Sequence, residues 1–229
     1  MHPTAFYNCQ QFFDTYASAF QCTGTKVIEI GSQDVNGSLR RCCPSTFEYV
    51  GVDFVSGKGV DFILEDPYSL PFENNSTDIV ISSSCFEHSE MFWVLFLEVI
   101  RILRPDGLFY LNAPSNGDFH CFPVDCWRFY PDSGHALVTW AKRNGMSPAL
   151  LESYTSMQIE ESWNDYVAVY IKDENLAQRH PRRILERKKD FYNGMVLGTE
   201  GYINYSSITE DKRELMALKQ NIGNQVRVK

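Results

Sequence analysis

Between residues 26 and 172, short apolar runs alternate with segments in which apolar residues recur at helical spacing. The apolar runs predict strands at 26–30, 48–53, 59–64, 77–82 and 108–113, followed by strand-like runs at 149–159 and 165–171. The helical spacing predicts a helix from Met91 to Leu103, which Arg104-Pro105-Asp106-Gly107 ends, and another at about 132–144. Strands that alternate with helices predict a parallel sheet covered on both faces, which the last two runs close as a hairpin-like pair.

The two ends of the chain have different patterns. In residues 1–25, aromatic residues recur at helical spacing, which predicts an amphipathic helix that packs on the core and can also cover a ligand pocket. Residues 173–229 are charged and mixed, which indicates an appendage, an oligomer contact or a lid. The predicted organisation is therefore an N-terminal helical cap (1–25), a main domain (26–172) and a C-terminal helical appendage (173–229).

Composition narrows the class of partner. The 229 residues carry a net charge of −8, which disfavours a nucleic-acid backbone as a general partner. The seven cysteines lack the regular spacing of a disulfide framework or a zinc site, so we expect reduced thiols. No segment has the form of a signal peptide or of an apolar run of about 18 residues, so we expect a cytoplasmic protein with no membrane span.

The first two predicted strands carry the most specific chemistry. The first ends in Glu29-Ile30-Gly31, and the second ends in Asp53 about twenty residues later. A Gly after a buried strand lets a ligand approach the backbone, and an acid at the tip of the next strand can accept two hydrogen bonds from a ribose diol. Together they predict a nucleoside pocket at the carboxyl ends of the sheet.

The order of short motifs resembles the class I S-adenosylmethionine-dependent methyltransferases over about residues 26–115. The motifs are Val27-Ile28-Glu29-Ile30-Gly31, Val50-Gly51-Val52-Asp53, Leu70-Pro71-Phe72, Asp78-Ile79-Val80, Glu87-His88 and Arg101-Ile102-Leu103-Arg104-Pro105-Asp106-Gly107. The resemblance implies an α/β, Rossmann-like, seven-stranded and mostly parallel sheet with helices on both faces and its last strand antiparallel. It also implies S-adenosyl-L-methionine as the cofactor.

The same resemblance implies roles for residues along the predicted pocket. Glu29, Gly31 and Ser32 would lie against the methionine part, and Asp53 would hold the ribose hydroxyls. Asp66 and Pro67 would meet the adenine, and Ser82 and Ser83 would lie under the sulfonium. The chain departs from the family at Gln33 and Val35, where glycines are usual, and Gly37 arrives two residues late. This departure also disfavours a dinucleotide site, which needs Gly-x-Gly-x-x-Gly beside a pyrophosphate.

A polar and aromatic stretch at 114–132 follows the last central strand, where loops face the ligand. It resembles loops of methyltransferases from glycan-modifying pathways, which implies a sugar, nucleotide-sugar or glycan acceptor. The residues that we expect to bind the acceptor are Glu87, Asp125, Trp127, Arg128 and Tyr130. The alternative is that the aromatic residues are core and that Arg128 pairs with Asp125 to brace the loop.

His120 and His88 are the candidate catalytic bases, because a hydroxyl acceptor must lose its proton whereas the cofactor itself supplies the activated methyl. Glu87 could orient either histidine, and the alternative for His88 is a structural hydrogen bond. No ligand spacing demands a metal. We therefore expect methyl transfer to a sugar or glycan hydroxyl. A small aromatic metabolite, a protein amine, and a non-catalytic cofactor-binding protein remain alternatives, and a homo-oligomer is possible.

Overall fold

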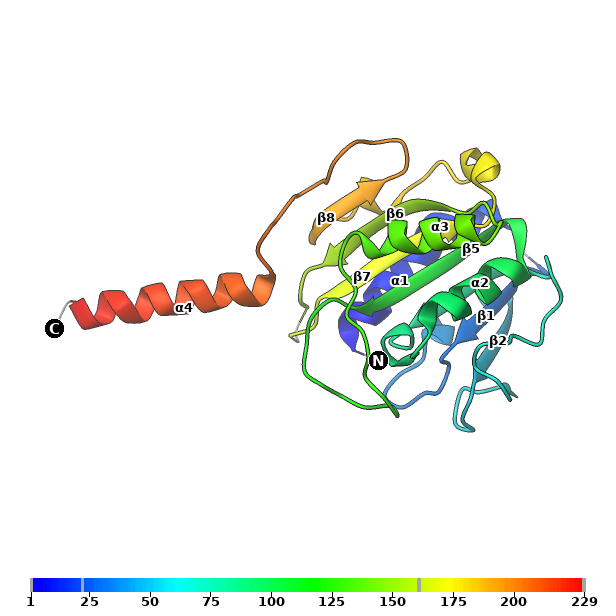
Figure 1. Cartoon of the computed structure of the whole chain (residues 1–229), viewed down its shortest axis with the longest axis horizontal. Coiled ribbons are helices and arrows are strands. Elements are labelled where there is room, and N and C mark those ends of the chain that lie inside the picture. The colour runs from blue at the N-terminus through cyan, green and yellow to red at the C-terminus, as the bar shows by residue number, and fades with distance from the viewer. Residues whose placement is uncertain (1, 22, 160–161, 228–229) are drawn as a thin grey trace.

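The computed structural model of the chain describes residues 2–21, 23–159 and 162–227. Its centre is an eight-stranded sheet in the order β3-β2-β1-β4-β5-β7-β6-β8 (Figure 1). The strands are β1 (Lys26–Ile30), β2 (Glu48–Asp53), β3 (Phe62–Ile63), β4 (Thr77–Ser83), β5 (Leu103–Pro114), β6 (Ala149–Ser156), β7 (Asp165–Ile171) and β8 (Phe191–Val196). The predicted α/β, mostly parallel fold is confirmed, because β1 to β5 pair in parallel and β7 runs antiparallel to β5.

The prediction of seven strands is wrong by one. The eighth strand, β8, pairs antiparallel with β6 at the edge of the sheet and comes from the segment expected to be a helical appendage. Residues 173–229 also form two 3-10 turns, Glu174–Arg179 and Ile184–Glu186, and the helix α4 (Glu210–Arg227). Part of this segment therefore belongs to the sheet.

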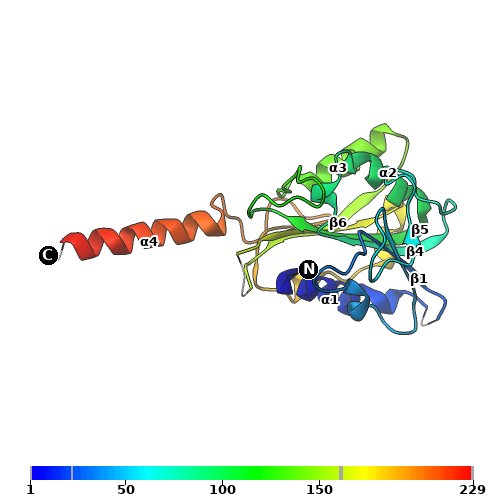
Figure 2. The same cartoon turned by 90° about the horizontal axis from the view of Figure 1, so that it is seen from below.

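Helices cover both faces of the sheet, as predicted. Figure 2 shows α2 (Phe92–Ile102) and α3 (Ser133–Arg143) on one face and α1 (Pro3–Tyr16) on the other. The sheet has a hydrophobic core on each face, and successive strand residues point to opposite faces. Each of three apolar pairs therefore supplies one residue to each core: Val27/Ile28, Ile79/Val80 and Phe109/Tyr110. This double burial explains why the central strands read as continuous apolar runs.

Strand β5 begins earlier than predicted. Residues 104–107 were expected to end the preceding helix, yet β5 starts at Leu103, directly after α2. Thr77 pairs with Leu103 and Ile79 with Leu108, so residues 104–107 bulge out of the ladder. A Cβ on Gly107 would lie 2.9 Å from the carbonyl oxygen of Asp78, which explains the need for glycine in this bulge.

The C-terminal helix α4 extends away from the body of the molecule (Figures 1 and 2). Its first turn is attached through Glu210, which accepts hydrogen bonds from the Gln158 backbone and the Asn164 side chain. Within the described ranges, no helix has the length and apolar character needed to cross a membrane. The six cysteines in these ranges are all free thiols, in agreement with the expectation from their spacing.

Candidate functional site

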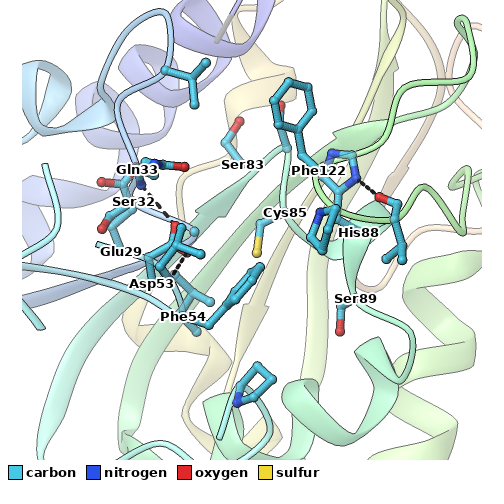
Figure 3. A pocket seen from close by; sticks show the side chains of 18 of the residues that line it. Glu29, Ser32, Gln33, Asp53, Phe54, Ser83, Cys85, His88, Ser89 and Phe122 are labelled. Carbon is cyan, nitrogen blue, oxygen red and sulfur yellow. Dashed lines mark hydrogen bonds between the residues drawn. The ribbon is translucent and has the colours of Figure 1, made fainter. Parts of the chain in front are cut away.

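A cavity of about 780 Å³ opens at the carboxyl ends of β1, β2 and β4. In Figure 3, Glu29, Ser32, Gln33 and Asp53 lie on one side of it, and His88 and Phe122 lie on the other. Ser83 and Cys85 lie between the two groups. The cavity therefore occupies the place where open α/β sheets bind ligands.

The turn after β1 depends on Gly31. Its backbone has a φ of +78°, and an added Cβ would lie 2.5 Å from the Cβ of Cys85. The N–H groups of Gly31 and Ser32 both donate to the carbonyl oxygen of Val52, at 3.0 and 3.1 Å. The turn thus folds back onto β2, and only glycine fits its closest point.

Glu29 lines the cavity and is almost fully buried. Burial raises the pKa of Glu29 to about 7, although the Tyr49 hydroxyl donates a hydrogen bond of 2.6 Å to its Oε2. Part of the Glu29 population is therefore protonated near neutral pH. A cationic group in the cavity would favour the ionised form.

Asp53 ends β2 and faces the same cavity. Its Oδ2 accepts from the backbone N–H of Gln33 at 3.1 Å, and its Oδ1 accepts from that of Val55 at 3.2 Å. Each carboxylate oxygen keeps a further acceptor site for a ligand hydroxyl. The two backbone bonds fix the orientation of the carboxylate in the cavity.

Of the predicted cofactor residues, Glu29, Gly31, Ser32, Asp53, Pro67 and Ser83 line the cavity, but Asp66 does not. Asp66 is exposed, and its Oδ1 accepts from the backbone N–H of Tyr68 at 2.8 Å. This carboxylate closes its own turn, as aspartates often do, and the expected contact with adenine stays a prediction. Apolar side chains that the sequence reasoning missed line this end instead, namely Phe54, Val55, Leu64 and Tyr68. The sequence signal for this apolar end of the cavity was Phe54-Val55, two large apolar residues that directly follow the strand β2 and are exposed.

The end of β4 carries a strained residue. Ser84 has a φ of +50°, and the 3-10 turn Phe86–His88 follows. The hydroxyl of Ser82 donates to the carbonyl oxygen of Ile30 at 3.0 Å, so Ser82 is a brace between β4 and β1. Ser83 accepts from the Asn112 side chain at 3.2 Å and lines the cavity. This abrupt turn directs Cys85 and His88 into the cavity.

The side chains of His88, His120 and Glu87 lie close together, although the two histidines are 32 positions apart in the sequence. The His88 and His120 ring centroids are 4.9 Å apart, and Nε2 of His88 is 3.7 Å from Oε1 of Glu87. His88 Nδ1 is 2.5 Å from the carbonyl oxygen of Val124, which only accepts, so Nδ1 carries the proton and Nε2 is basic. Burial lowers the pKa of His88 and raises that of Glu87 to about 8.

The loop at 114–132 is held by an internal ion pair. Arg128 donates to both oxygens of Asp125, at 2.6 and 2.9 Å, and Asp125 also accepts from the His120 backbone N–H at 2.8 Å. These bonds to Arg128 hold the pKa of Asp125 well below its usual range. The alternative interpretation of this pair, a brace for the loop, is thus the one that the structure shows.

Four of the five residues expected to bind the acceptor lie in this loop but do not line the cavity: Asp125, Trp127, Arg128 and Tyr130. Trp127 packs edge-on against Phe92 and Trp93, and Tyr130 is exposed. The fifth, Glu87, is buried and also does not line the cavity, and its Oε1 lies 3.7 Å from Nε2 of His88. Their predicted contact with the acceptor stays a prediction, and in the structure the Asp125–Arg128 pair holds the loop that carries His120.

Three further residues line the cavity near His120 and were missed: His2, Phe122 and Trp163. The Trp163 ring lies 5.1 Å from His120 and packs where a Cβ on Gly117 would collide with it. His2 is stacked on Trp163 at 5.9 Å, so the residue that precedes α1 contributes to the wall of the cavity.

Comparison with known proteins finds matches for the central part of the chain. Residues 33–111 match the family model described as a methyltransferase domain. The chain is 31% identical over 96 residues to the phthiotriol/phenolphthiotriol dimycocerosates methyltransferase of Mycobacterium tuberculosis, covering 40% of this chain and 32% of that protein. It is 43% identical over 119 residues to methyltransferase 1 of that name from Mycobacterium ulcerans, covering 44% of this chain and 42% of that protein. The chain thus spans about a third to two fifths of the length of these relatives.

The fold has counterparts among solved structures. The 1,6-didemethyltoxoflavin-N1-methyltransferase of Burkholderia thailandensis, solved with S-adenosylhomocysteine, superposes with a TM-score of 0.56 at 13% identity. The match covers 74% of this chain and 79% of that chain. The chain therefore has the fold of this methyltransferase and contains a stretch that matches the methyltransferase domain.

Proposed function

We propose that the protein is an S-adenosylmethionine-dependent methyltransferase. The observation that carries the proposal is the pairing, in one cavity, of a fixed carboxylate at the tip of β2 with two histidines across from it. The cofactor is supported by the methyltransferase-domain match and by the S-adenosylhomocysteine bound in the Burkholderia enzyme of the same fold. Asp53 would hold the ribose, Glu29 would face the cationic methionine part, and Ser83 would lie near the sulfonium.

The bound cofactor would supply an electrophilic methyl group, which an acceptor displaces from sulfur in line. The chain's own part is to orient the acceptor and to take its proton. Nε2 of His88 is unprotonated, and His120 is the more exposed of the two rings, with 29% of its side chain accessible. We therefore place the reacting hydroxyl at the two histidines, with His120 as the first candidate base.

The acceptor is proposed to carry a hydroxyl. Phe122, Trp163 and Val124 present flat or apolar surfaces beside the histidines, which suit the face of a sugar ring. The mycobacterial relatives are named for phthiotriol and phenolphthiotriol dimycocerosates rather than for a sugar, so those compounds are the second acceptor class. The same surfaces suit a long apolar acceptor.

Labelled S-adenosylmethionine tests the cofactor, and an acceptor screen tests the reaction. Saturable binding that Asp53→Ala weakens strongly is the expected result, and normal binding in this variant would remove the cofactor assignment. Sugars, nucleotide sugars and lipid alcohols are then incubated with enzyme and cofactor, and mass spectrometry detects the added methyl group. Absence of turnover with intact cofactor binding would favour the non-catalytic alternative. His120→Ala should lose turnover and keep cofactor binding.

A further inference from the structure

We propose that Glu87, His88 and His120 form a binding site for one divalent transition-metal cation, with an open coordination position toward the cavity. One ligand atom from each residue lies within 4.8 Å of the others. Two histidines and one glutamate that leave a position free are the donor set of several catalytic zinc sites. Imidazole nitrogens also favour zinc and its neighbours over magnesium.

The independent observation is the state of Glu87. Its side chain is 1% exposed, and neither carboxylate oxygen accepts a hydrogen bond from another described residue. The nearest basic atom, Nε2 of His88, is 3.7 Å from Oε1, which is too far for a hydrogen bond. A buried carboxylate without such partners is costly, and a cation bound to its oxygens would offset that cost.

The spacing of these atoms fits ligands of one cation after a small inward movement. Zinc–nitrogen and zinc–oxygen bonds are about 2.0–2.2 Å, so two tetrahedral ligands of one ion are about 3.3–3.6 Å apart. The 3.7 Å between Glu87 and His88 is just above this range. His120 lies on a loop with its side chain 29% accessible, so it is the ligand that can move.

Both histidines have the outer contacts that metal-binding histidines usually have. His88 Nδ1 is 2.5 Å from the Val124 carbonyl oxygen, and His120 Nδ1 is 3.0 Å from that of Asp118. Asp125 Oδ2 is 3.4 Å from His120 Nδ1 as well. Such contacts fix the orientation of the ring and the position of its proton.

The charges around Glu87 leave room for a cation. The charged groups that act on it most are Asp165, Arg128 and Asp125, two acids against one base. Arg128 is already bonded to Asp125 through both carboxylate oxygens. Nε2 of His2 lies 3.4 Å from Asp165, so the basic side chains near these acids contact Asp125 and Asp165 rather than Glu87.

The activating role of the cation rests on the proposed function, whereas its binding does not. With the cation bound, the acceptor hydroxyl would occupy the open position, and its proton would pass to solvent water. The oxygen would then form a bond to the methyl carbon as the carbon–sulfur bond breaks and its electron pair stays on sulfur. His88 and His120 would act as ligands rather than bases, so chelation separates the two roles.

Cobalt(II) is the first probe, since it replaces zinc and absorbs visible light in low-coordinate sites. The full chain is stripped with EDTA, desalted and titrated with Co²⁺, then with Zn²⁺ as competitor. We expect saturation at one cation per chain and displacement by Zn²⁺. Glu87→Gln and His120→Gln should each weaken Co²⁺ binding by more than about 100-fold, while the control His135→Gln, on the exposed side of α3, should not.

Specific results would overturn the site. One is that wild type takes up neither Co²⁺ nor Zn²⁺. Another is that wild type, Glu87→Gln and His120→Gln take up these cations equally. The third is that Mg²⁺ saturates the site and the transition metals do not. Circular dichroism checks folding, and if Glu87→Gln does not fold, the partly exposed His120 decides the result. Cofactor binding without metal uptake would leave the proposed function standing and remove this site, whereas metal uptake without cofactor binding would do the reverse. Turnover unaffected by EDTA would remove the activating role.

Discussion

The two sides of the cavity are built in different ways. One side, here called the cofactor wall, consists of Glu29, Gly31, Ser32 and Asp53, which lie at the ends of adjacent strands and are fixed by backbone hydrogen bonds. The other side, here called the loop wall, consists of His88, His120, Phe122 and Val124, which come from a 3-10 turn and an irregular loop. The sheet sets the first wall directly, whereas the second depends on side-chain contacts such as the Asp125–Arg128 pair. The cofactor wall should therefore be the more sensitive to substitution.

Asp53→Ala should have the largest effect of the substitutions on cofactor affinity. Two hydrogen bonds to a charged carboxylate contribute about 1.5–3 kcal/mol each, so their loss should weaken S-adenosylmethionine binding at least about 100-fold. Calorimetric titration measures this change. The matched control is Asp66→Ala, because the Asp66 side chain closes its own turn outside the cavity. Equal losses in both variants would contradict the geometry of the cofactor wall.

Gly31→Ala tests the backbone of the same wall. Gly145 has nearly the same φ, +79° against +78°, but an added Cβ there would meet open space. Gly145→Ala should therefore lower the free energy of unfolding by only about 1–2 kcal/mol, the cost of holding alanine in the left-handed conformation. Gly31→Ala should cost about 3 kcal/mol or more, because its Cβ would also collide with Cys85. Denaturant titration compares the two, and similar losses would show that the turn can relax.

Glu29 predicts a pH dependence of stability. Its pKa is about 7 in the folded protein against a usual 4.5, so the folded state retains a proton that the unfolded state releases. This stabilisation is fully present below about pH 4.5 and is lost as the pH rises through 7, a change of about 3 kcal/mol without cofactor. Urea titrations between pH 5 and pH 8 measure it.

The control for this pH dependence is Glu29→Gln, which cannot titrate. As the pH rises, wild type should lose stability relative to Glu29→Gln, since wild type must then bury a carboxylate. A difference that stays constant with pH would show that Glu29 is not protonated in the folded protein. Because a cofactor ammonium would favour the ionised form, cofactor affinity in wild type should rise over the same interval.

The difference between the two walls also explains which features the sequence could predict. β1 and β2 have the predicted bounds because both are buried apolar runs that end in an acid or just before Gly31. β8 was missed because it is a half-buried edge strand interrupted by Asn193 and Gly194, with no continuous apolar run. Local patterns identify residues that neighbouring strands bring together, so the sequence could predict that Glu29 and Asp53 lie near each other.

Contacts between loops have no such local signal. Asp66 occupies the expected place in the sequence, but its carboxylate bonds to a backbone N–H two residues later, a choice that composition does not reveal. Glu87 and His120 were identified separately as chemical residues, yet their clustering depends on the Val124 carbonyl and the turn at Ser84. Trp163 enters the cavity from the segment between β6 and β7, where the pattern predicted only a connection.

Asp125→Asn should have the smallest effect and should act on the loop wall alone. The variant weakens the bonds to Arg128 and to the His120 backbone but leaves every residue of the cofactor wall in place. Cofactor affinity should stay within about twofold, while kcat/KM for the acceptor should fall about tenfold, which corresponds to about 1.4 kcal/mol of transition-state stabilisation. The control is Asp118→Asn, since only the backbone carbonyl of Asp118 contacts His120. If Asp125→Asn weakened cofactor binding as much as turnover, the two walls would be one coupled unit, and the distinction between them would fail.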